Sequence, residues 1–118
     1  MILSPADRTT IEAELRQAQV ALGQGNAGKA RVCARRASGA ALRAWFRAGG
    51  AAAGPADALS LLKLAAADTG LPGELRQAAA RLSTAVTDRD RLAFSDDPVG
   101  DAGIIVGAIE SLTAGGDV

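Results

Sequence analysis

Three arginines in the first half of the chain have the residue type and spacing of a phosphate-binding row. Arg36, Arg43 and Arg47 are separated by seven and four residues, so on a helix they lie within about 40° of one another. A row of guanidinium groups on a rigid helix can follow the phosphates of a nucleic acid, releasing counterions as it binds. The row therefore predicts a surface that binds RNA or a nucleotide.

The same row has a second interpretation, in which it faces solvent or pairs with acidic residues of the second half of the chain. Residues 1–50 carry eight basic and three acidic side chains, whereas residues 51–118 carry five and ten, giving charges of +5 and −5. Asp57, Asp68 and Asp101 are candidates for such pairing. The chain has only two Phe and one Trp, which gives little support for stacking on bases. Both interpretations stay open.

The absence of histidine restricts the chemistry that this chain can perform. With no His and a single Cys, Cys33, the chain lacks His-based acid–base catalysis, Ser–His and Cys–His nucleophile pairs, and His metal ligands. A lone cysteine also excludes disulfide frameworks and Cys-rich zinc sites. Cys33 lies on a predicted apolar face, where it is expected to be a small buried hydrophobe. We predict no catalytic residue, no metal and no cofactor.

A glycine-rich segment matches the residue pattern of nucleotide-binding motifs but not their expected secondary structure. Residues 23–29 read GQGNAGK, which fits the dinucleotide pattern and misses the NTPase phosphate loop by one residue. Both motifs need a strand before them, but the segment that ends at Leu22 has helical periodicity. Ala30 also stands where a hydroxyl would bind magnesium. We therefore predict a turn between two helices.

Helical periodicity recurs along the chain and period-two alternation does not, so we predict an all-α fold. Capping residues and prolines mark the helix starts. The predicted helices follow Ser4 up to Gly23, follow Asn26 to about Ala48, and run from Pro55 to Gly70, from Pro72 to Val86 and from Pro98 to about Leu112. A charged loop is expected over residues 87–97.

The second predicted helix has two apolar faces, which is typical of a helix that is central in a bundle or touches a second chain. One face carries mostly small residues: Ala30, Cys33, Ala34, Ala37, Ala41, Ala44 and Trp45. The other carries Val32, Gly39 and Phe46, and Arg31 and Arg35 flank the alanine stripe. The last helix has a row of glycines: Gly100, Gly103 and Gly107. This row and the Val32–Gly39–Phe46 face are the two candidates for a homodimer interface.

No segment of the sequence predicts membrane insertion or export. The longest strongly apolar stretch, residues 102–109, is far shorter than the ~20 residues that a spanning helix needs. The first eight residues lack a basic region followed by an apolar run. We therefore expect a cytoplasmic protein.

Several of these segments together resemble the HEPN superfamily, whose name stands for higher eukaryotes and prokaryotes nucleotide-binding. The resemblance rests on the first amphipathic helix, the turn GQGNAGKAR and the segment ARRASGAALRAWF. The stretch SDDPVGDAGIIVGAIE is similar to the last helix of small prokaryotic members. The resemblance implies one domain over residues 1–118, folded as an antiparallel up-and-down four-helix bundle with an additional short helix, and usually a homodimer.

The family includes ribonucleases, which are often toxins paired with a small nucleotidyltransferase, and non-catalytic relatives that bind nucleotides or nucleic acid. The catalytic members use an R-x(4–6)-H motif. Here the nearest counterpart is Arg89 or Arg91, with Phe94 or Ser95 where the histidine would fall. The resemblance thus favours a non-catalytic module that binds a nucleotide, RNA or a protein partner such as a nucleotidyltransferase. A ribonuclease with a degenerate active site is the alternative.

Overall fold

The computed structural model describes residues 2–49 and 57–115. These residues form five α-helices and one 3-10 turn, with no strand among them, so the predicted all-α class is confirmed. The elements are α1 (Pro5–Gly23), α2 (Ala27–Ala48), α3 (Ala58–Ala67), α4 (Gly73–Ser83), η1 (Val86–Asp88) and α5 (Pro98–Gly115).

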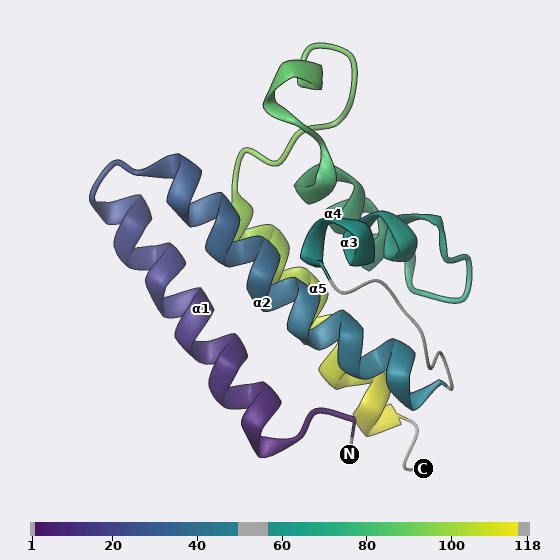
Figure 1. Cartoon of the computed structure of the whole chain (residues 1–118). Helices are drawn as coiled ribbons and strands as arrows, with labels where there is room; N and C mark the ends of the chain where they lie inside the picture. Colours follow the sequence, from purple (N-terminus) through teal and green to yellow (C-terminus); the bar gives the residue numbers. More distant parts are fainter. Residues whose placement is uncertain (1, 50–56, 116–118) are drawn as a thin grey trace.

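The first two helices form an antiparallel hairpin whose ends are set by local hydrogen bonds (Figure 1). The Ser4 hydroxyl accepts from the Asp7 N–H at 3.0 Å, and the Asp7 carboxylate accepts from the Ser4 N–H at 2.9 Å. This capping box begins α1. Gly25, with φ of 77°, makes the turn, and the Asn26 side chain then accepts from the Lys29 N–H at 3.1 Å. The glycine-rich motif is therefore preceded by a helix, and its interpretation as a turn is confirmed.

α2 is the central helix of the fold. It packs against α1, α3 and α5 and touches α4, while α3 and α4 pack against each other and α5 also contacts α4 (Figure 1). The central position explains why α2 has two apolar faces, because neighbouring helices lie on more than one side of it. All members of the small-residue face are buried except Trp45, which is half-buried. The connection from α4 to α5 projects away from the other helices at the top of the view (Figure 1).

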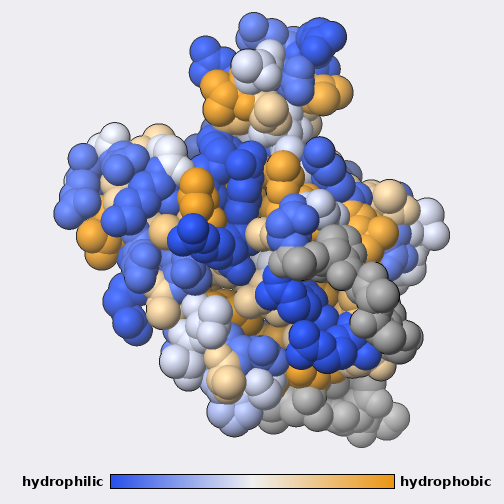
Figure 2. Space-filling view, viewed as in Figure 1, coloured by the Kyte–Doolittle hydropathy of each residue, from blue (hydrophilic) through white to orange (hydrophobic). Residues whose placement is uncertain are grey.

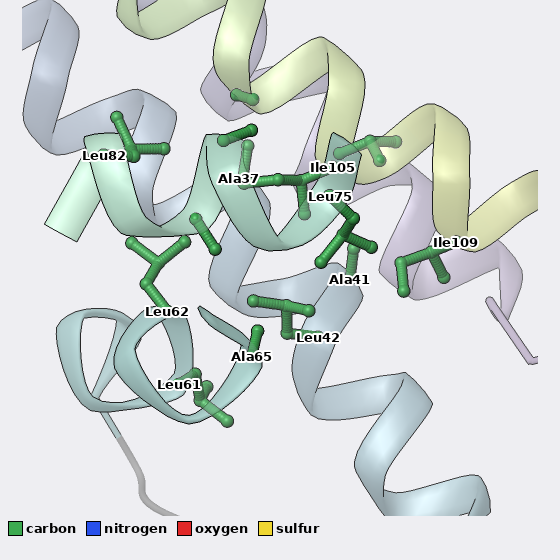
Figure 3. Packing of buried hydrophobic residues seen from close by; sticks show 14 of the residues in the cluster. Ala37, Ala41, Leu42, Leu61, Leu62, Ala65, Leu75, Leu82, Ile105 and Ile109 are labelled. Atoms are coloured by element: carbon green, nitrogen blue, oxygen red, sulfur yellow. The ribbon is translucent and has the colours of Figure 1, made fainter. Parts of the chain in front are cut away.

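The core is one cluster to which all five helices contribute. Figure 3 shows leucines and isoleucines of α3, α4 and α5 converging on alanines of α2. Burying one such large side chain stabilises the fold by roughly 1.5–3 kcal/mol. The small residues of α2 let several helices approach it closely at once. Central members are Ile11, Ala37, Ala41, Leu42, Leu61, Leu62, Leu75, Leu82, Ile105 and Ile109.

One glycine permits the closest of these approaches. A Cβ atom added to Gly39 would lie 2.8 Å from the Ala58 Cβ and 3.0 Å from the Ala58 Cα. Since the obstruction includes backbone, a side chain at position 39 would force α2 and α3 apart. Gly39 is buried by this contact, so the start of α3 covers part of the predicted Val32–Gly39–Phe46 face.

The third helix differs from its predicted bounds at both ends. It begins at Ala58, after Asp57, whose side chain accepts from the Ser60 N–H at 2.8 Å. The predicted start at Pro55 lies outside the described residues. The helix ends at Ala67 rather than Gly70, because the Asp68 carboxylate accepts from the Gly70 N–H at 2.9 Å and closes a tight turn.

The prediction that Val86 continues the apolar stripe of the fourth helix was wrong. α4 ends at Ser83, and Val86 lies in η1 with 56% of its surface exposed. The Thr84 hydroxyl donates to the Ala80 carbonyl at 2.8 Å. This hydrogen bond gives a partner to a carbonyl of the last turn of α4, where the chain leaves the helix. The other predicted members of this stripe, Leu75, Ala78, Ala79 and Leu82, are buried.

Candidate functional site

The predicted arginine row lies on the solvent side of α2. Arg36 and Arg47 are exposed, and Arg43 is half-buried and engaged with another part of the protein. Within residues 2–49 and 57–115, neither Arg36 nor Arg47 makes an ion pair. Hydrophilic residues gather over the middle of the molecule in the same view, where α2 lies in front (Figure 2). The structure thus leaves two of the three guanidinium groups open to solvent.

Two members of the row line a small hollow between α1 and α2. Its volume is about 190 Å³, and its walls include Arg43, Arg47, Thr10 and Asp7. The Asp7 carboxylate accepts from the Ser4 N–H, so it also serves the start of α1. The hollow has room for a group of phosphate size beside two guanidinium groups and one hydroxyl. Arg36 is not among its lining residues.

The three acids named as possible partners of the row each have another partner. Asp57 caps α3 through the Ser60 N–H, and Asp68 accepts from the Gly70 N–H. Asp101 binds Arg81 of α4. Among the described residues, none of these three acids makes an ion pair with Arg36 or Arg47, so for these two arginines the structure favours the solvent-exposed interpretation.

The other side of α2 carries Arg35, which faces the end of α4. Its Nε donates to the Leu82 carbonyl at 2.8 Å and its Nη2 to the Thr84 carbonyl at 3.4 Å. Carbonyls at a helix C-terminus have no partner within the helix, and a cation there also interacts favourably with the helix dipole. Arg35 thus ties α2 to the end of α4. Burial lowers the pKa of Arg35 from its ordinary value.

Arg31, one turn earlier on α2, holds the connection between α4 and α5. Its Nη2 donates to the Ser95 carbonyl at 2.8 Å, and its Cζ lies 4.1 Å from the centre of the Phe94 ring. The aromatic ring and the guanidinium group attract each other through a cation–π interaction. Burial, followed by the positive charge of Arg35, lowers the pKa of Arg31.

A third arginine at the same place has a carboxylate partner. Arg81 of α4 binds Asp101 of α5 through Nη2 at 2.6 Å and through Nε at 3.2 Å to both carboxylate oxygens. The Asp101 side chain is only 8% exposed. Hydrogen bonding to Asp101 raises the pKa of Arg81. We call the group formed by Arg31, Arg35, Arg81, Phe94, Ser95 and Asp101 the polar junction.

The four residues proposed for a degenerate ribonuclease motif are divided between two environments. Arg89 and Arg91 are exposed on the projecting connection, where Arg91 Nη2 lies 2.9 Å from an Asp88 carboxylate oxygen. Phe94 and Ser95 instead pack onto α2 through Arg31. Phe94 and Ser95 therefore belong to the polar junction, and Ser95 is fully buried within it.

Sequence reasoning missed the pairing of Arg81 with Asp101, although a signal for it was present. Asp101 precedes Ile105 by four residues, so it lies on the apolar face of the last helix. Arg81 follows Ala78 by three residues, so it lies beside the apolar stripe of the fourth helix. A carboxylate on one apolar stripe and an arginine beside another indicate a buried ion pair between the two helices. Arg31 and Arg35 were placed correctly, but nothing in the sequence named the carbonyl groups that they bind.

Cys33 is 1% exposed, which confirms the prediction of a small buried side chain. Burial, followed by the charge of Glu14 on α1, raises the pKa of the Cys33 thiol. A raised pKa keeps the sulfur protonated and weakens it as a nucleophile. In the described part of the chain, no three His, Cys, Asp or Glu side chains are grouped so that they could hold a metal ion.

Comparison with known proteins gives no match to a family model, to a curated protein or to a solved structure. Among the described helices, none combines the length and the apolar character needed to cross a bilayer. The function of this all-helical protein therefore has to be argued from its own surface.

Proposed function

We propose that this protein is a non-catalytic, HEPN-like binding module that takes up RNA or a nucleotide through Arg36, Arg43 and Arg47. One observation carries the proposal: Arg36 and Arg47 are exposed and unpaired in the described part of the chain, while the acids that might have neutralised them bind other groups. Arginines held in such a row can contact the phosphates of a nucleic acid.

The hollow beside the row supports phosphate as the group that is recognised. Arg43 and Arg47 approach it from α2, and Thr10 approaches it from α1. Guanidinium and hydroxyl groups are donors that suit phosphate oxygens, and the two guanidinium groups outnumber the one carboxylate of the hollow, Asp7, which accepts from the Ser4 N–H. The volume of about 190 Å³ is too small for a whole nucleotide, so the base would lie outside, and recognition would be independent of base identity.

The same proposal includes the bundle type and the assembly. α1, α2, α4 and α5 would correspond to the four helices of an antiparallel up-and-down bundle, with the ten-residue α3 as the additional short helix. For a homodimer, the glycine face of α5 is the better supported candidate, because a Cβ on Gly103 or Gly107 would meet nothing within 4 Å. A nucleotidyltransferase is the protein partner that the family resemblance suggests.

Equilibrium binding of fluorescently labelled single-stranded RNA at several salt concentrations tests the proposal. We expect an affinity that falls steeply with salt, as counterion release requires. The double variant Arg36→Ala/Arg47→Ala should bind at least tenfold more weakly. Its salt slope should fall by about two, because each removed arginine leaves one phosphate with its counterion still bound. Arg43 stays unchanged because it is also engaged within the protein.

The matched control removes two exposed charges elsewhere, with Arg16→Ala on α1 and Lys63→Ala on α3. It has the same net charge as the test variant, so a general electrostatic effect would weaken both equally. An equal loss in the two variants, or binding that does not respond to salt, contradicts the assignment. Cleavage of the RNA that is lost in Arg89→Ala or Arg91→Ala would instead establish the ribonuclease alternative.

A further inference from the structure

The polar junction contains more positive charge than its carboxylates neutralise. Arg31, Arg35 and Arg81 meet there, but only Arg81 has a carboxylate at ion-pair distance among the described residues. Asp96 and Asp101 reach Arg31 only as more distant charges. Half-buried cations are normally paired, because removing a charge from water is costly. Arg35 donates hydrogen bonds to two carbonyl groups. Arg31 is therefore the arginine of the polar junction whose charge is least balanced by the described residues.

Two polar atoms at this place are buried and have no hydrogen-bond partner among the residues that the structure describes. One is Arg31 Nη1 and the other is the hydroxyl oxygen of Ser95, a residue whose surface is 0% exposed. The two residues adjoin, since Arg31 Nη2 donates to the Ser95 carbonyl at 2.8 Å. A buried polar group without a partner typically costs about 1–3 kcal/mol, so a pair of them at one place indicates a missing third group.

We propose that the polar junction binds one small oxyanion, a phosphoryl group, which accepts hydrogen bonds from Arg31 Nη1 and from the Ser95 hydroxyl. The donors define the ligand class, because a guanidinium group only donates and the serine hydroxyl can donate as well. An anion also neutralises the charge of Arg31, which a water molecule cannot do. This site lies on the side of α2 away from the exposed row and does not depend on the proposed RNA-binding surface.

Free phosphate and the phosphate of a nucleotide present the same chemistry to this site. The Phe94 ring already packs on Arg31, so the structure assigns it no role in stacking on a base. Inorganic phosphate, adenosine monophosphate and adenosine therefore form the three arms of the test. Phosphate and the nucleotide should bind, and adenosine should not. Tighter binding of the nucleotide than of phosphate would identify the nucleotide as the source.

The test follows thermal unfolding by circular dichroism while phosphate replaces chloride at constant ionic strength. For the wild type we expect a saturable rise in Tm, because a ligand that binds only the folded state stabilises it by mass action. In Ser95→Ala the phosphate affinity should fall about tenfold, the loss expected for one hydrogen bond to a charged group. Arg31→Lys keeps the charge but removes Nη1 together with the Nη2 that donates to the Ser95 carbonyl, so its loss should be at least as large.

Phosphate also stabilises proteins by exclusion from their surface, so the informative quantity is the difference between wild type and Ser95→Ala in one solution. Ser95→Ala should fold, since it removes a hydroxyl that has no hydrogen-bond partner in the described part of the chain. The loss of phosphate response caused by Ser95→Ala should be equally large in the wild type and in the Arg36→Ala/Arg47→Ala background, which separates this site from the exposed row. An unchanged response in Ser95→Ala overturns the proposal. So does a crystal structure from phosphate solution that shows only water between Arg31 and Ser95.

Discussion

Arg35 and Arg36 are neighbours in the sequence, but they face different sides of α2. Arg35 faces the end of α4 and binds two carbonyl groups at 2.8 and 3.4 Å, whereas Arg36 is exposed and has no ion pair within the described residues. One residue of helix rotates a side chain by about 100°, and here that rotation separates a structural role from a candidate binding role. The position on the helix, and not the residue type, decides what each arginine does.

The two sides also differ in how much each contact contributes to folding. On the inner side, Arg31, Arg35 and Arg81 join α2, α4 and the start of α5 by hydrogen bonds that are partly shielded from water. On the outer side, water can solvate Arg36 and Arg47 in both the folded and the unfolded chain. Removing an inner group should therefore lower stability, and removing an outer one should affect only binding. The following substitutions test this difference.

The largest effect is expected for Asp101→Ala, which leaves Arg81 without its carboxylate inside the polar junction. Breaking a buried ion pair by removing one partner costs about 3–5 kcal/mol. Since the Arg81 side chain is 31% exposed, we expect the lower end of this range, about 3 kcal/mol. Urea denaturation followed by the fluorescence of Trp45, the single tryptophan of the chain, measures the free energy of unfolding.

The control for this substitution is Asp88→Ala, which breaks the pair between Asp88 and the 80% exposed side chain of Arg91. An exposed pair contributes roughly 0.2–1 kcal/mol, so this variant should unfold at nearly the wild-type urea concentration. Equal losses for Asp101→Ala and Asp88→Ala would show that the polar junction stabilises the fold no more than a surface ion pair.

The next effect compares the two neighbouring arginines directly. Arg35→Met should lower the free energy of unfolding by about 2 kcal/mol, because it removes the donors for the Leu82 and Thr84 carbonyls. Arg36→Met should change it by no more than about 0.5 kcal/mol, as is usual for an exposed position. Arginine and methionine have similar helix propensities, so the same replacement at both positions isolates the contacts. If Arg36→Met lowered the free energy of unfolding as much as Arg35→Met, Arg36 could not be a solvent-exposed side chain without a structural role.

The helices were largely predictable because their signals are local. Ser4, Asn26 and Asp97 were recognised as caps from the residues next to them, and in the structure Asp97 accepts from the Gly100 N–H at 3.0 Å. The alanine face of α2 followed from periodicity alone. The third helix was predicted less well at its end, since Gly70 was expected to stop it, whereas the turn closed by Asp68 ends the helix at Ala67.

The site was predictable only for the side chains that remain in solvent. The exposed positions of Arg36 and Arg47 follow from their place on the helix, outside the alanine face. The polar junction depends on contacts between residues far apart in the chain, such as Arg31 with Ser95. Hydrophobic periodicity and helix-capping residues describe single helices. They do not indicate which helix end packs beside which arginine of another helix. The partners of Arg31 and Arg35 could therefore be found only from the packed structure.

The smallest expected effect concerns Gly39, which extends the inner side of α2 to its contact with α3. Alanine at an exposed helix position is more favourable than glycine by up to about 1 kcal/mol. At Gly39 this gain should be outweighed, because the new Cβ would lie 2.8 Å from the Ala58 Cβ and 3.0 Å from its Cα, and overpacking costs about 1–3 kcal/mol. We expect a net loss of about 1 kcal/mol for Gly39→Ala. Gly103→Ala on α5, where a Cβ would meet nothing within 4 Å of the same chain, should instead stabilise the folded monomer by roughly 0.5–1 kcal/mol. Opposite signs at the two glycines in urea denaturation would show that α3 is held against α2 by direct backbone contact, whereas a gain at both would mean that the two helices can separate at little cost.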